Sequence, residues 1–379
     1  MKHHTLRTLA ACLGATLIGV ASGARAVDGV LEINDASILA AGGYPGAIIA
    51  PGSYVLTGNL TPPPGINGIN VFAPDVTLDL NGFEIVGGGG GATGINNLGG
   101  PGLTVRNGSV TGFGIGIAGG ATSKIFHVHT GFNTGTGISG SGCLIVESTS
   151  TGNATGIQAD RCKLENNVVG GNTAIGIVGM SNVIVHNNVI GNGAGGILTL
   201  GGSTIQENVV QDNTTFGISD GIFGPPPPPP PPPLPARNDI RGNTINNNGG
   251  AAGGPGVSLS LPALISENTV SGNTGSGVAC GSACTLSGNL IVSNNTSGLP
   301  ASGGAIVGPG GNVTENSISF NLGFGLSISV FSGYSQNTLQ ANGFGGVGPN
   351  EIPVGGPIHP TSGFQNLCQG VAGPAPTCP

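Results

Sequence analysis

The sequence predicts an all-β fold, a parallel β-helix (β-solenoid) of roughly 11–12 coils, on the strength of three observations. Glycine supplies 76 of the 379 residues and only 7% of residues are charged, yet the mean hydropathy is positive at +0.24. A short phrase with two asparagines around an aliphatic residue returns many times along the chain. A glycine followed by an aliphatic residue also recurs, at intervals close to 20 residues.

The composition excludes several classes of protein. A disordered chain would be more highly charged and less apolar, and an ordinary globular domain carries about a quarter charged residues. Glycine near one-fifth of the chain without a Gly-X-Y period excludes collagen. What remains is a fold of very short strands joined by many tight turns.

The asparagine phrase reads SENTVSGN at 266–273, QENVVQDN at 206–213 and TENSISFN at 314–321. Its general form is Asn-x-[Val/Ile/Leu]-x-x-Asn, and a copy at 188–192 is one residue shorter. The glycine signal falls at Gly116, Gly137, Gly156, Gly176, Gly196, Gly217, Gly256, Gly277 and Gly325, and its first five intervals are 21, 19, 20, 20 and 21 residues.

A period near 20 residues suits a leucine-rich repeat or a β-solenoid. The dense L-x-x-L-x-L spine of leucine-rich repeats is absent, and Gly, Asn and Thr between the aliphatic residues disfavour helices. Each unit instead offers two or three β-branched pairs, such as Val183 and Val185, separated by turn residues. Coils stacked about 4.8 Å apart would form a rod about 55 Å long.

The asparagines are interpreted as structural. In SENTVSGN a strand ends at Ile265, the chain bends at Glu267 and Asn268, and Val270 points into the core. Asparagine tolerates the left-handed conformation that such a bend needs. Its amide can also bond to the asparagine one coil above or below, and this ladder would satisfy polar groups otherwise buried without partners.

Residues 1–26 are expected to be a cleaved signal peptide. Lys2 and Arg7 make a basic start, an apolar run follows, and Ala24-Arg25-Ala26 has the form of a cleavage site. The apolar run is too short to span a bilayer, and no second run of that length follows. An ordinary N-terminal helix and a lipid attachment at Cys12 are the alternatives. Export would place the mature protein outside the cell, on its surface or in the periplasm.

Removal of residues 1–26 would leave six basic residues against 16 acidic ones, a net charge of −10. This charge disfavours nucleic acid and anionic membranes as partners. Neutral glycans, cationic partners and calcium remain compatible with it. The expected partner is an extracellular glycan or a cell-surface component, and the sequence gives no oligomeric state.

Six cysteines would remain in the exported chain, where disulfides are expected. They allow 15 connectivities but lie in three local couples, and no CxxC motif indicates a zinc site. The couples are Cys143 with Cys162, Cys280 with Cys284 and Cys368 with Cys378. The first couple should stack on neighbouring coils, either as a disulfide or as two buried thiols. The second should form a disulfide that closes a turn.

The chain divides into four segments. The signal peptide is followed by an N-terminal capping segment at 27–70, the β-helix at 71–349 and a disulfide-closed tail at 350–379. A Pro-rich loop at 222–236 interrupts the β-helix and contains nine consecutive prolines, Pro225–Pro233. This run is expected to form an exposed polyproline II spur, because proline donates no ladder hydrogen bond. It is either a tolerated loop expansion or a docking arm.

The segments VTLDLNGFEIVG (76–87) and LTVRNGSVTGFGIGI (103–117), with the repeats through Asn342, resemble the right-handed parallel β-helix proteins of the pectin-lyase-like superfamily. The resemblance covers most of the mature chain and implies a right-handed, single-stranded β-helix. It implies little about activity, because that fold hosts lyases, hydrolases, epimerases and non-catalytic adhesins.

The catalytic motifs of the superfamily are not visible in this sequence. The Arg-Pro-x-x-Arg of the lyases is missing, and so are the Asn-Thr-Asp and Gly-His-Gly of the galacturonases. Asp79 lies in VTLDLNG, where the resemblance implies a fold element. No metal site and no cofactor are expected, and calcium would enter only if the protein were a lyase.

Aligning the coils on the turn asparagine places ionisable residues one or two positions before it on successive coils. They should form a stripe along one edge of the rod, either a ligand-binding groove edge or a solvated turn edge whose charges offset one another. Its centre would be Glu165, His186, Glu207 and Arg241, and its other members Arg106, His127, Glu147 and Glu267.

The sequence therefore predicts an exported β-helix scaffold without a recognisable active site, adhesin-like or weakly glycan-binding. The alternative is a carbohydrate-active enzyme, a polysaccharide lyase or epimerase that uses the stripe on an extracellular polysaccharide. Few aromatic residues, 4% of the chain with no Trp, count against tight sugar binding.

Overall fold

The structure is a computed structural model that describes residues 29–221, 237–300, 302–329 and 331–343, with three short strands beyond them, Glu351–Pro353, His359–Pro360 and Leu367–Gln369. The expected signal peptide and the proline run Pro225–Pro233 lie outside these residues.

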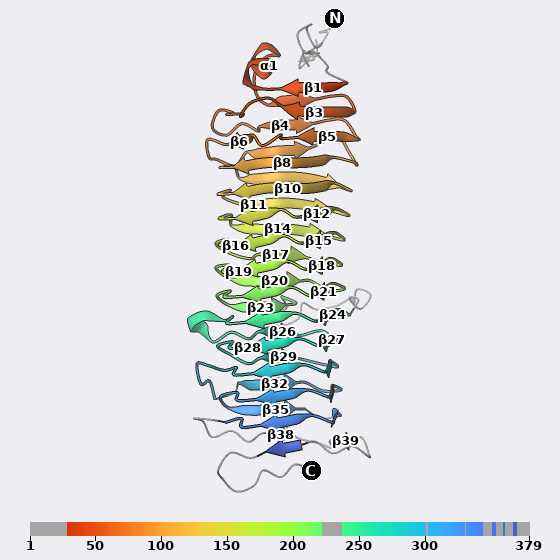
Figure 1. Ribbon diagram of the computed structural model, residues 1–379, viewed down its shortest axis with the longest axis vertical. Coiled ribbons are helices and arrows are strands. Elements are labelled where there is room, and N and C mark those ends of the chain that lie inside the picture. Colours follow the sequence, from red (N-terminus) through yellow and green to blue (C-terminus); the bar gives the residue numbers. More distant parts are fainter. Residues whose placement is uncertain are drawn as a thin grey trace, which may run out of the picture.

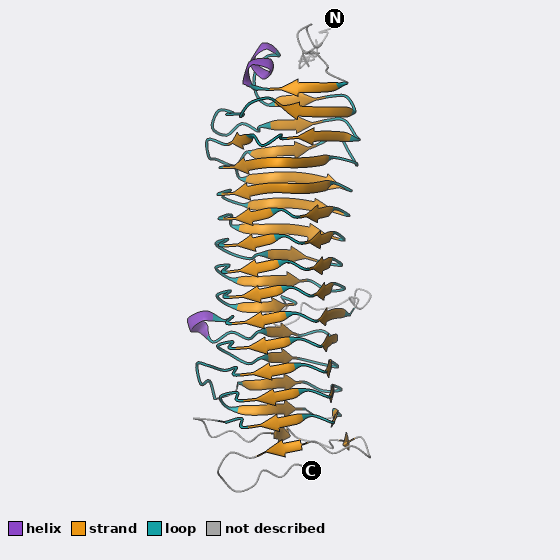
Figure 2. Ribbon diagram, in the orientation of Figure 1, coloured by secondary structure: helices purple, strands orange, loops and turns teal. Residues whose placement is uncertain are grey.

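The fold is a rod of stacked coils in which every strand pairs in parallel with its equivalents on the neighbouring coils (Figures 1 and 2). The smaller sheet has 14 strands, one for each coil. They are β2 (Gly46–Ile48), β4 (Ile69–Val71), β7 (Thr93–Asn97), β9 (Ile115–Ala121), β11 (Thr136–Ser141), β14 (Thr155–Asp160), β17 (Ile177–Gly179), β20 (Gly195–Thr199), β23 (Phe216–Ser219), β26 (Val257–Leu259), β29 (Val278–Cys280), β32 (Gly303–Val307), β35 (Phe324–Ile328) and β38 (Glu351–Pro353).

The larger sheet has 26 strands and bends at a turn, so that it forms two rows. The first row holds β1 (Val30–Ile33), β3 (Gly52–Leu56), β5 (Val76–Asp79), β12 (Leu144–Val146), β15 (Lys163–Glu165), β18 (Val183–Val185), β21 (Thr204–Gln206), β24 (Asn238–Arg241), β27 (Ala263–Ser266), β30 (Thr285–Ser287), β33 (Asn312–Thr314), β36 (Gly333–Ser335) and β39 (His359–Pro360). The second row holds β6 (Glu84–Val86), β13 (Thr149–Thr151), β16 (Val168–Gly170), β19 (Asn188–Ile190), β22 (Val209–Gln211), β25 (Thr244–Asn246), β28 (Thr269–Ser271), β31 (Leu290–Val292), β34 (Ser317–Ser319), β37 (Thr338–Gln340) and β40 (Leu367–Gln369). The long strands β8 (Thr104–Thr111) and β10 (Lys124–Gly131) run through both rows.

The predicted right-handed parallel β-helix is confirmed, with about 14 turns instead of 11–12. The difference arises at the two ends, because β2 and β4 begin coils within 27–71 and β38 adds one within 350–379. Thirteen steps of about 4.8 Å make a rod about 62 Å long.

The core is a set of aliphatic stacks that run along the rod. Ile157, Ile177, Ile197 and Ile218 are paired in register on four successive coils, and none of them is exposed to solvent. Because the outward residue of each strand alternates with the inward one, a single aliphatic side chain per short strand fills the interior. This explains why each repeat contains isolated aliphatic residues among polar ones.

Two buried asparagine ladders follow the turns on either side of the second strand row, confirming the predicted ladder. At Asn268 the side-chain amide donates to Asn289 Oδ1 at 3.0 Å and to the carbonyl of Ile240 at 2.9 Å. The first ladder is Asn167, Asn187, Asn208, Asn243, Asn268, Asn289, Asn316 and Asn337, and the second is Asn133, Asn153, Asn172, Asn192, Asn213, Asn248, Asn273, Asn294, Asn321 and Asn342. One expectation was wrong: Glu267, with φ 59°, takes the left-handed conformation in place of Asn268.

The glycine of the Gly-aliphatic signal forms a column against the second ladder. A Cβ atom on Gly196 would lie 2.6 Å from the carbonyl oxygen of Gly217 and 2.8 Å from Asn213 Nδ2. Gly176 and Gly256 face Asn192 and Asn273 in the same way. The repeat therefore requires glycine here because the ladder amide occupies the space of a side chain.

The first end of the rod carries helix α1 (Asp35–Ala40), whose Ile38 is buried against the coils. The Asn34 side chain caps the helix by accepting a hydrogen bond from the Ser37 backbone N–H. Asp35 accepts hydrogen bonds from the Tyr44 hydroxyl and from Thr61, which tie the helix to the loop that follows β3. Ile38 lies against Gly46 of β2, so the helix covers the first strand of the smaller sheet.

Extra residues enter the described coils at turns. The 3-10 helix η1 (Gly250–Ala252) lies in such an insertion (Figure 2), between β25 and β26. A second insertion separates β31 from β32. The two loops touch, since a Cβ atom on Gly253 would lie 2.5 Å from Leu299 Cδ1.

Two of the three cysteine couples form disulfides. Cys143 and Cys162 lie in register on neighbouring coils with their Cα atoms 4.5 Å apart, and Cys280 and Cys284 close a turn. Cys143 and Cys162 are therefore a disulfide and not the alternative pair of buried thiols. The expected link of Cys368 to Cys378 lies outside the residues whose side chains are described.

Candidate functional site

The stripe residues lie where the first strand row turns into the second, on successive coils of the rod. Glu165, Val185, Gln206 and Arg241 are paired in register at the last position of their strands. His186 comes directly after this position on its own coil, and on several other coils the equivalent residue is also ionisable. The stripe thus consists of two adjacent columns. Glu165 and Arg241 lie at strand ends, and Arg106, within the long strand β8, is in register with them. The turn column holds His127, Glu147, His186, Glu207 and Glu267, each at the left-handed position that follows.

The turn column has a left-handed backbone, which directs its side chains to solvent. His127, Glu147, His186 and Glu207 have φ values of 51°, 49°, 56° and 55°. Gly242 takes the same place on the next coil, with φ 65°. The left-handed conformation is needed because the chain changes direction between two strands at the one residue that precedes the ladder asparagine.

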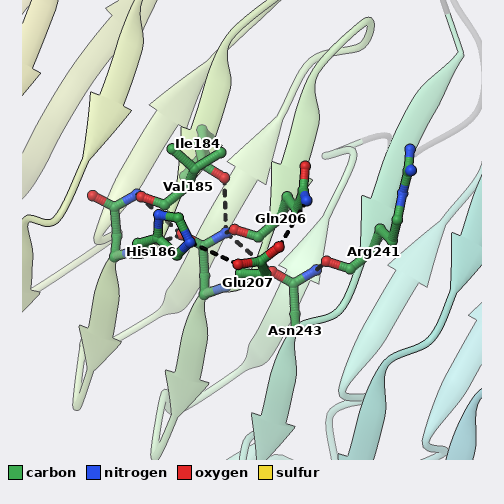
Figure 3. A network of polar contacts seen from close by, with 9 residues as sticks. Ile184, Val185, His186, Gln206, Glu207, Arg241 and Asn243 are labelled. Carbon is green, nitrogen blue, oxygen red and sulfur yellow. Dashed lines mark hydrogen bonds and ion pairs between the residues drawn. The ribbon is translucent and has the colours of Figure 1, made fainter.

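His186 and Glu207 form a contact between two neighbouring coils (Figure 3). The His186 Nε2 atom lies 2.7 Å from Glu207 Oε2, and Gln206 Nε2 donates to Glu207 Oε1 at 2.8 Å. These hydrogen bonds hold the pKa of the Glu207 carboxyl below its ordinary value of 4.5, and the one from His186 has the larger effect. Glu207 therefore stays ionised, and its two oxygens are occupied by neighbours.

His127 and Glu147 repeat this arrangement nearer the first end of the rod. The His127 Nε2 atom contacts Glu147 Oε2, and both side chains are about half exposed. The two pairs show that imidazole and carboxylate meet wherever the turn column places them on consecutive coils.

Glu165 and Arg241 pair within their own strands. Lys163 Nζ lies 2.7 Å from Glu165 Oε2, and Arg241 contacts Asp239 two residues earlier. Arg241 extends away from Glu207 (Figure 3). The predicted centre of the stripe therefore separates into three contacts, and its four members do not converge on one space.

The remaining members lie at the two ends of the stripe. Arg106 Nε bonds to Asp79 Oδ2 at 2.9 Å across neighbouring strands. Glu267 is exposed, and its Cγ would be 3.8 Å from a Cβ atom on Gly288 of the next coil. Asp79 thus takes part in the edge as well as in the VTLDLNG motif.

Sequence reasoning missed the partners Lys163, Asp239 and Asp79. A signal existed, because residues two apart on a strand point to the same face, and Lys163-Leu-Glu165 and Asp239-Ile-Arg241 have this spacing. Such pairs satisfy opposite charges on one exposed face, where each contributes about 0–1 kcal/mol.

Within the described ranges, no group of three or more His, Cys, Asp or Glu side chains is arranged to hold a metal ion. No helix in that part of the chain is long and apolar enough to cross a membrane.

Comparison with known proteins shows likeness in structure only. No family model and no curated protein matches the sequence. Similar solved structures include the Dettilon tailspike protein (13% identity, 83% of this chain, TM-score 0.44) and the periplasmic alginate epimerase AlgG (13%, 90% of this chain and 82% of that one, TM-score 0.43). The surface adhesin PfbA of Streptococcus pneumoniae is also similar (12%, 70% of this chain and 78% of that one, TM-score 0.37).

The chain spans 60% of the length of the tailspike protein. At these identities the likeness concerns the fold alone. The fold itself follows from the strand pairing, with one strand in the smaller sheet and two in the larger sheet for a typical coil. By this architecture the protein is a parallel β-helix, as its sequence predicted.

Proposed function

We propose that this protein is an exported β-helix scaffold, adhesin-like or weakly glycan-binding, which presents its long regular faces to an extracellular glycan or cell-surface component. The observation that carries the proposal is the pairing of charges along the stripe, from Lys163 with Glu165 to His186 with Glu207. A carboxylate that is paired with a lysine or an imidazole on the same surface has its charge balanced there, as expected for an exposed edge of a scaffold.

The two disulfides support export. Cys143 joins Cys162 and Cys280 joins Cys284, and structural disulfides form and persist in oxidising compartments. The expected signal peptide at 1–26 agrees with this location and is proposed with it.

The shape supports a scaffold. A solenoid repeats one surface along its axis, so that a ligand with a repeating structure meets the same groups on many coils. Many weak contacts then add to a useful affinity without a deep pocket.

A glycan array and a uronate panel would test this proposal together. We expect the protein to bind array glycans weakly and to leave polymeric uronates unchanged, with no new ultraviolet absorption from an unsaturated product. His186→Ala and Glu165→Ala should bind the array as the wild-type protein does. Absence of any wild-type binding would contradict the glycan-binding part of the proposal.

The second candidate is a polysaccharide lyase or epimerase, favoured by the geometry of His186 and Glu207. An imidazole oriented by a carboxylate at 2.7 Å is a common arrangement for a general base. Only under this candidate would calcium be a cofactor, bound against a uronate.

The chain offers a matched control for this candidate, since His127 and Glu147 form the same kind of contact on other coils. Formation of an unsaturated or epimerised product that His186→Ala abolishes and His127→Ala leaves intact would establish the enzyme and overturn the scaffold.

A further inference from the structure

An exposed phenylalanine stands at the second turn, on the other side of the second strand row from the stripe. Phe132 follows β10, its side chain is 73% exposed, and its backbone is left-handed with φ 54°. The equivalent residues on the neighbouring coils are Gly112 and Gly152, with φ 74° and 68°. Glycine is the residue that this conformation favours.

Phe132 therefore contributes little to folding. A bulky side chain at positive φ is sterically unfavourable, and an exposed ring gains no burial in return. A strained residue without a packing role is a candidate for a functional one.

The ring of Phe132 and the imidazole of His129 contact two adjacent residues of the next coil, Gly152 and Thr151. A Cβ atom on Gly152 would lie 3.1 Å from Phe132 Cδ1, so the ring reaches over that glycine. The His129 ring lies over Gly131, and its Nε2 atom is 3.2 Å from Thr151 Oγ1. The chain places an aromatic face and a hydrogen-bonding imidazole side by side.

Further polar groups continue this surface toward the first end of the rod. Thr111 and Thr151 flank Gly131 in register on the two neighbouring coils. The Thr111 hydroxyl donates to Glu84 Oε1 at 2.6 Å. Hydroxyl, imidazole and carboxylate groups thus surround the position where Gly131 has no side chain.

We propose that Phe132, His129, Thr111 and Thr151 form a subsite for a pyranose unit of a neutral hexose polysaccharide. The apolar C–H face of the sugar would stack on the Phe132 ring, because such faces match the π surface of an aromatic side chain. The imidazole and hydroxyl groups would exchange hydrogen bonds with the sugar hydroxyls. The acidic chain favours a neutral polymer over an anionic one. This inference rests on the proposed glycan binding and assigns it to an edge other than the stripe.

The chain supplies a matched control at Phe320. This residue occupies the same turn on a later coil, with φ 55° and 53% exposure. Ser317 stands there in place of His129, and Ser319 in place of Gly131. Phe320 thus shares the exposed ring and the left-handed backbone but lacks the imidazole and the glycine beneath it.

The test uses the mature protein on immobilised neutral glucans, mannans and galactans. We expect Phe132→Gly to weaken binding to the best of these polymers about tenfold and His129→Ala about fivefold, while Phe320→Gly changes it less than twofold. Phe132→Gly should melt no lower than the wild-type protein, because glycine relieves the strained turn, so lost binding could not be attributed to misfolding.

A second measurement uses Phe132→Trp, which creates the only tryptophan in the chain. Its fluorescence should shift when the bound polymer is added, and binding should be retained. If Phe132→Gly binds the polymer as tightly as the wild-type protein does, or if the emission of the indole does not change, the subsite is overturned. The proposed function would not be affected by either result. No wild-type binding to any glycan would overturn both.

Discussion

The residue before each ladder asparagine decides what the first turn displays. Its left-handed backbone points the side chain outward, so His186 and Glu207 on consecutive coils meet at 2.7 Å. The same rule places His127 beside Glu147. A polar residue in a tight turn is expected from the sequence, but the contact depends on which coils are consecutive and on the side-chain conformation.

At the same scale, Asp35 gives the first end of the rod a defined pH dependence. Burial raises the pKa of its carboxyl, but hydrogen bonds from Tyr44 and Thr61 outweigh that effect and hold the pKa below the ordinary 3.8. A folded-state pKa below the unfolded one stabilises the fold above pH 3.8, and this contribution is lost as the pH falls through the folded-state pKa.

We therefore predict that Asp35→Asn lowers the free energy of unfolding by about 1–2 kcal/mol at pH 6. The difference from the wild-type protein should narrow below pH 3.8, where the carboxyl of the unfolded chain becomes protonated, and disappear once the pH falls below the lowered folded-state pKa. Urea unfolding followed by circular dichroism at pH 6 and pH 3 measures both values. An equal difference at the two pH values would contradict the assignment.

At the scale of the element, the ladders join one coil to the next. Asn187 Nδ2 donates to the carbonyls of Leu164 and Val185 at 2.9 Å and to Asn208 Oδ1 at 3.0 Å. Its Oδ1 accepts the backbone N–H of Asn167 at 2.9 Å. A single buried amide thus satisfies groups on three consecutive coils.

We predict that Asn187→Ala destabilises the protein by about 3 kcal/mol, because several buried groups lose their partners at once. The next residue, Asn188, is exposed on the strand surface and provides the control. Asn188→Ala should change stability by less than about 0.5 kcal/mol. Chemical denaturation of both variants makes the comparison, and equal losses would refute the structural role of the ladder.

At the scale of the whole molecule, stability accumulates coil by coil, since each coil contacts only its neighbours. A covalent link between two coils therefore stabilises the middle of the rod. Cys143 and Cys162 close a loop of 19 residues, whereas Cys280 and Cys284 close a loop of four within a single turn.

We predict that replacing Cys143 and Cys162 together by Ala lowers the free energy of unfolding by about 3 kcal/mol, and replacing Cys280 and Cys284 by about 2 kcal/mol. The longer loop constrains the unfolded chain more strongly. Denaturant titration without reductant measures the two losses, and a larger loss at the turn disulfide would contradict this ranking.

The fold could be predicted in most respects. Isolated aliphatic residues such as Val270 became core, and Asn268 became a ladder residue. Cys143 and Cys162 stacked as their equal distance from the turn implied. The coil count was too low, because strands β2, β4 and β38 lie in segments that lack the asparagine phrase. Backbone pairing continued where the side-chain pattern had stopped.

The candidate site was predictable only in outline. The stripe lies on one edge, yet Glu165 pairs with Lys163, and Arg241 pairs with Asp239, in place of a shared centre. A repeat pattern gives the position of a residue in its coil but not the side-chain conformation that selects one partner among several within reach. Phe132 was missed for a related reason, since its turn position is marked on the neighbouring coils only by glycine.

By itself, the sequence determined the architecture: a period near 20 residues with alternating aliphatic side chains permits few folds other than stacked parallel coils. Only the tertiary structure decided the contacts that cross from coil to coil, among them the glycine column against the second ladder, the His–Glu pairs of the stripe and the position of the Phe132 ring over Gly152. The physical reason is that periodicity acts along the chain, whereas these contacts act between coils, where insertions and side-chain geometry determine which atoms meet.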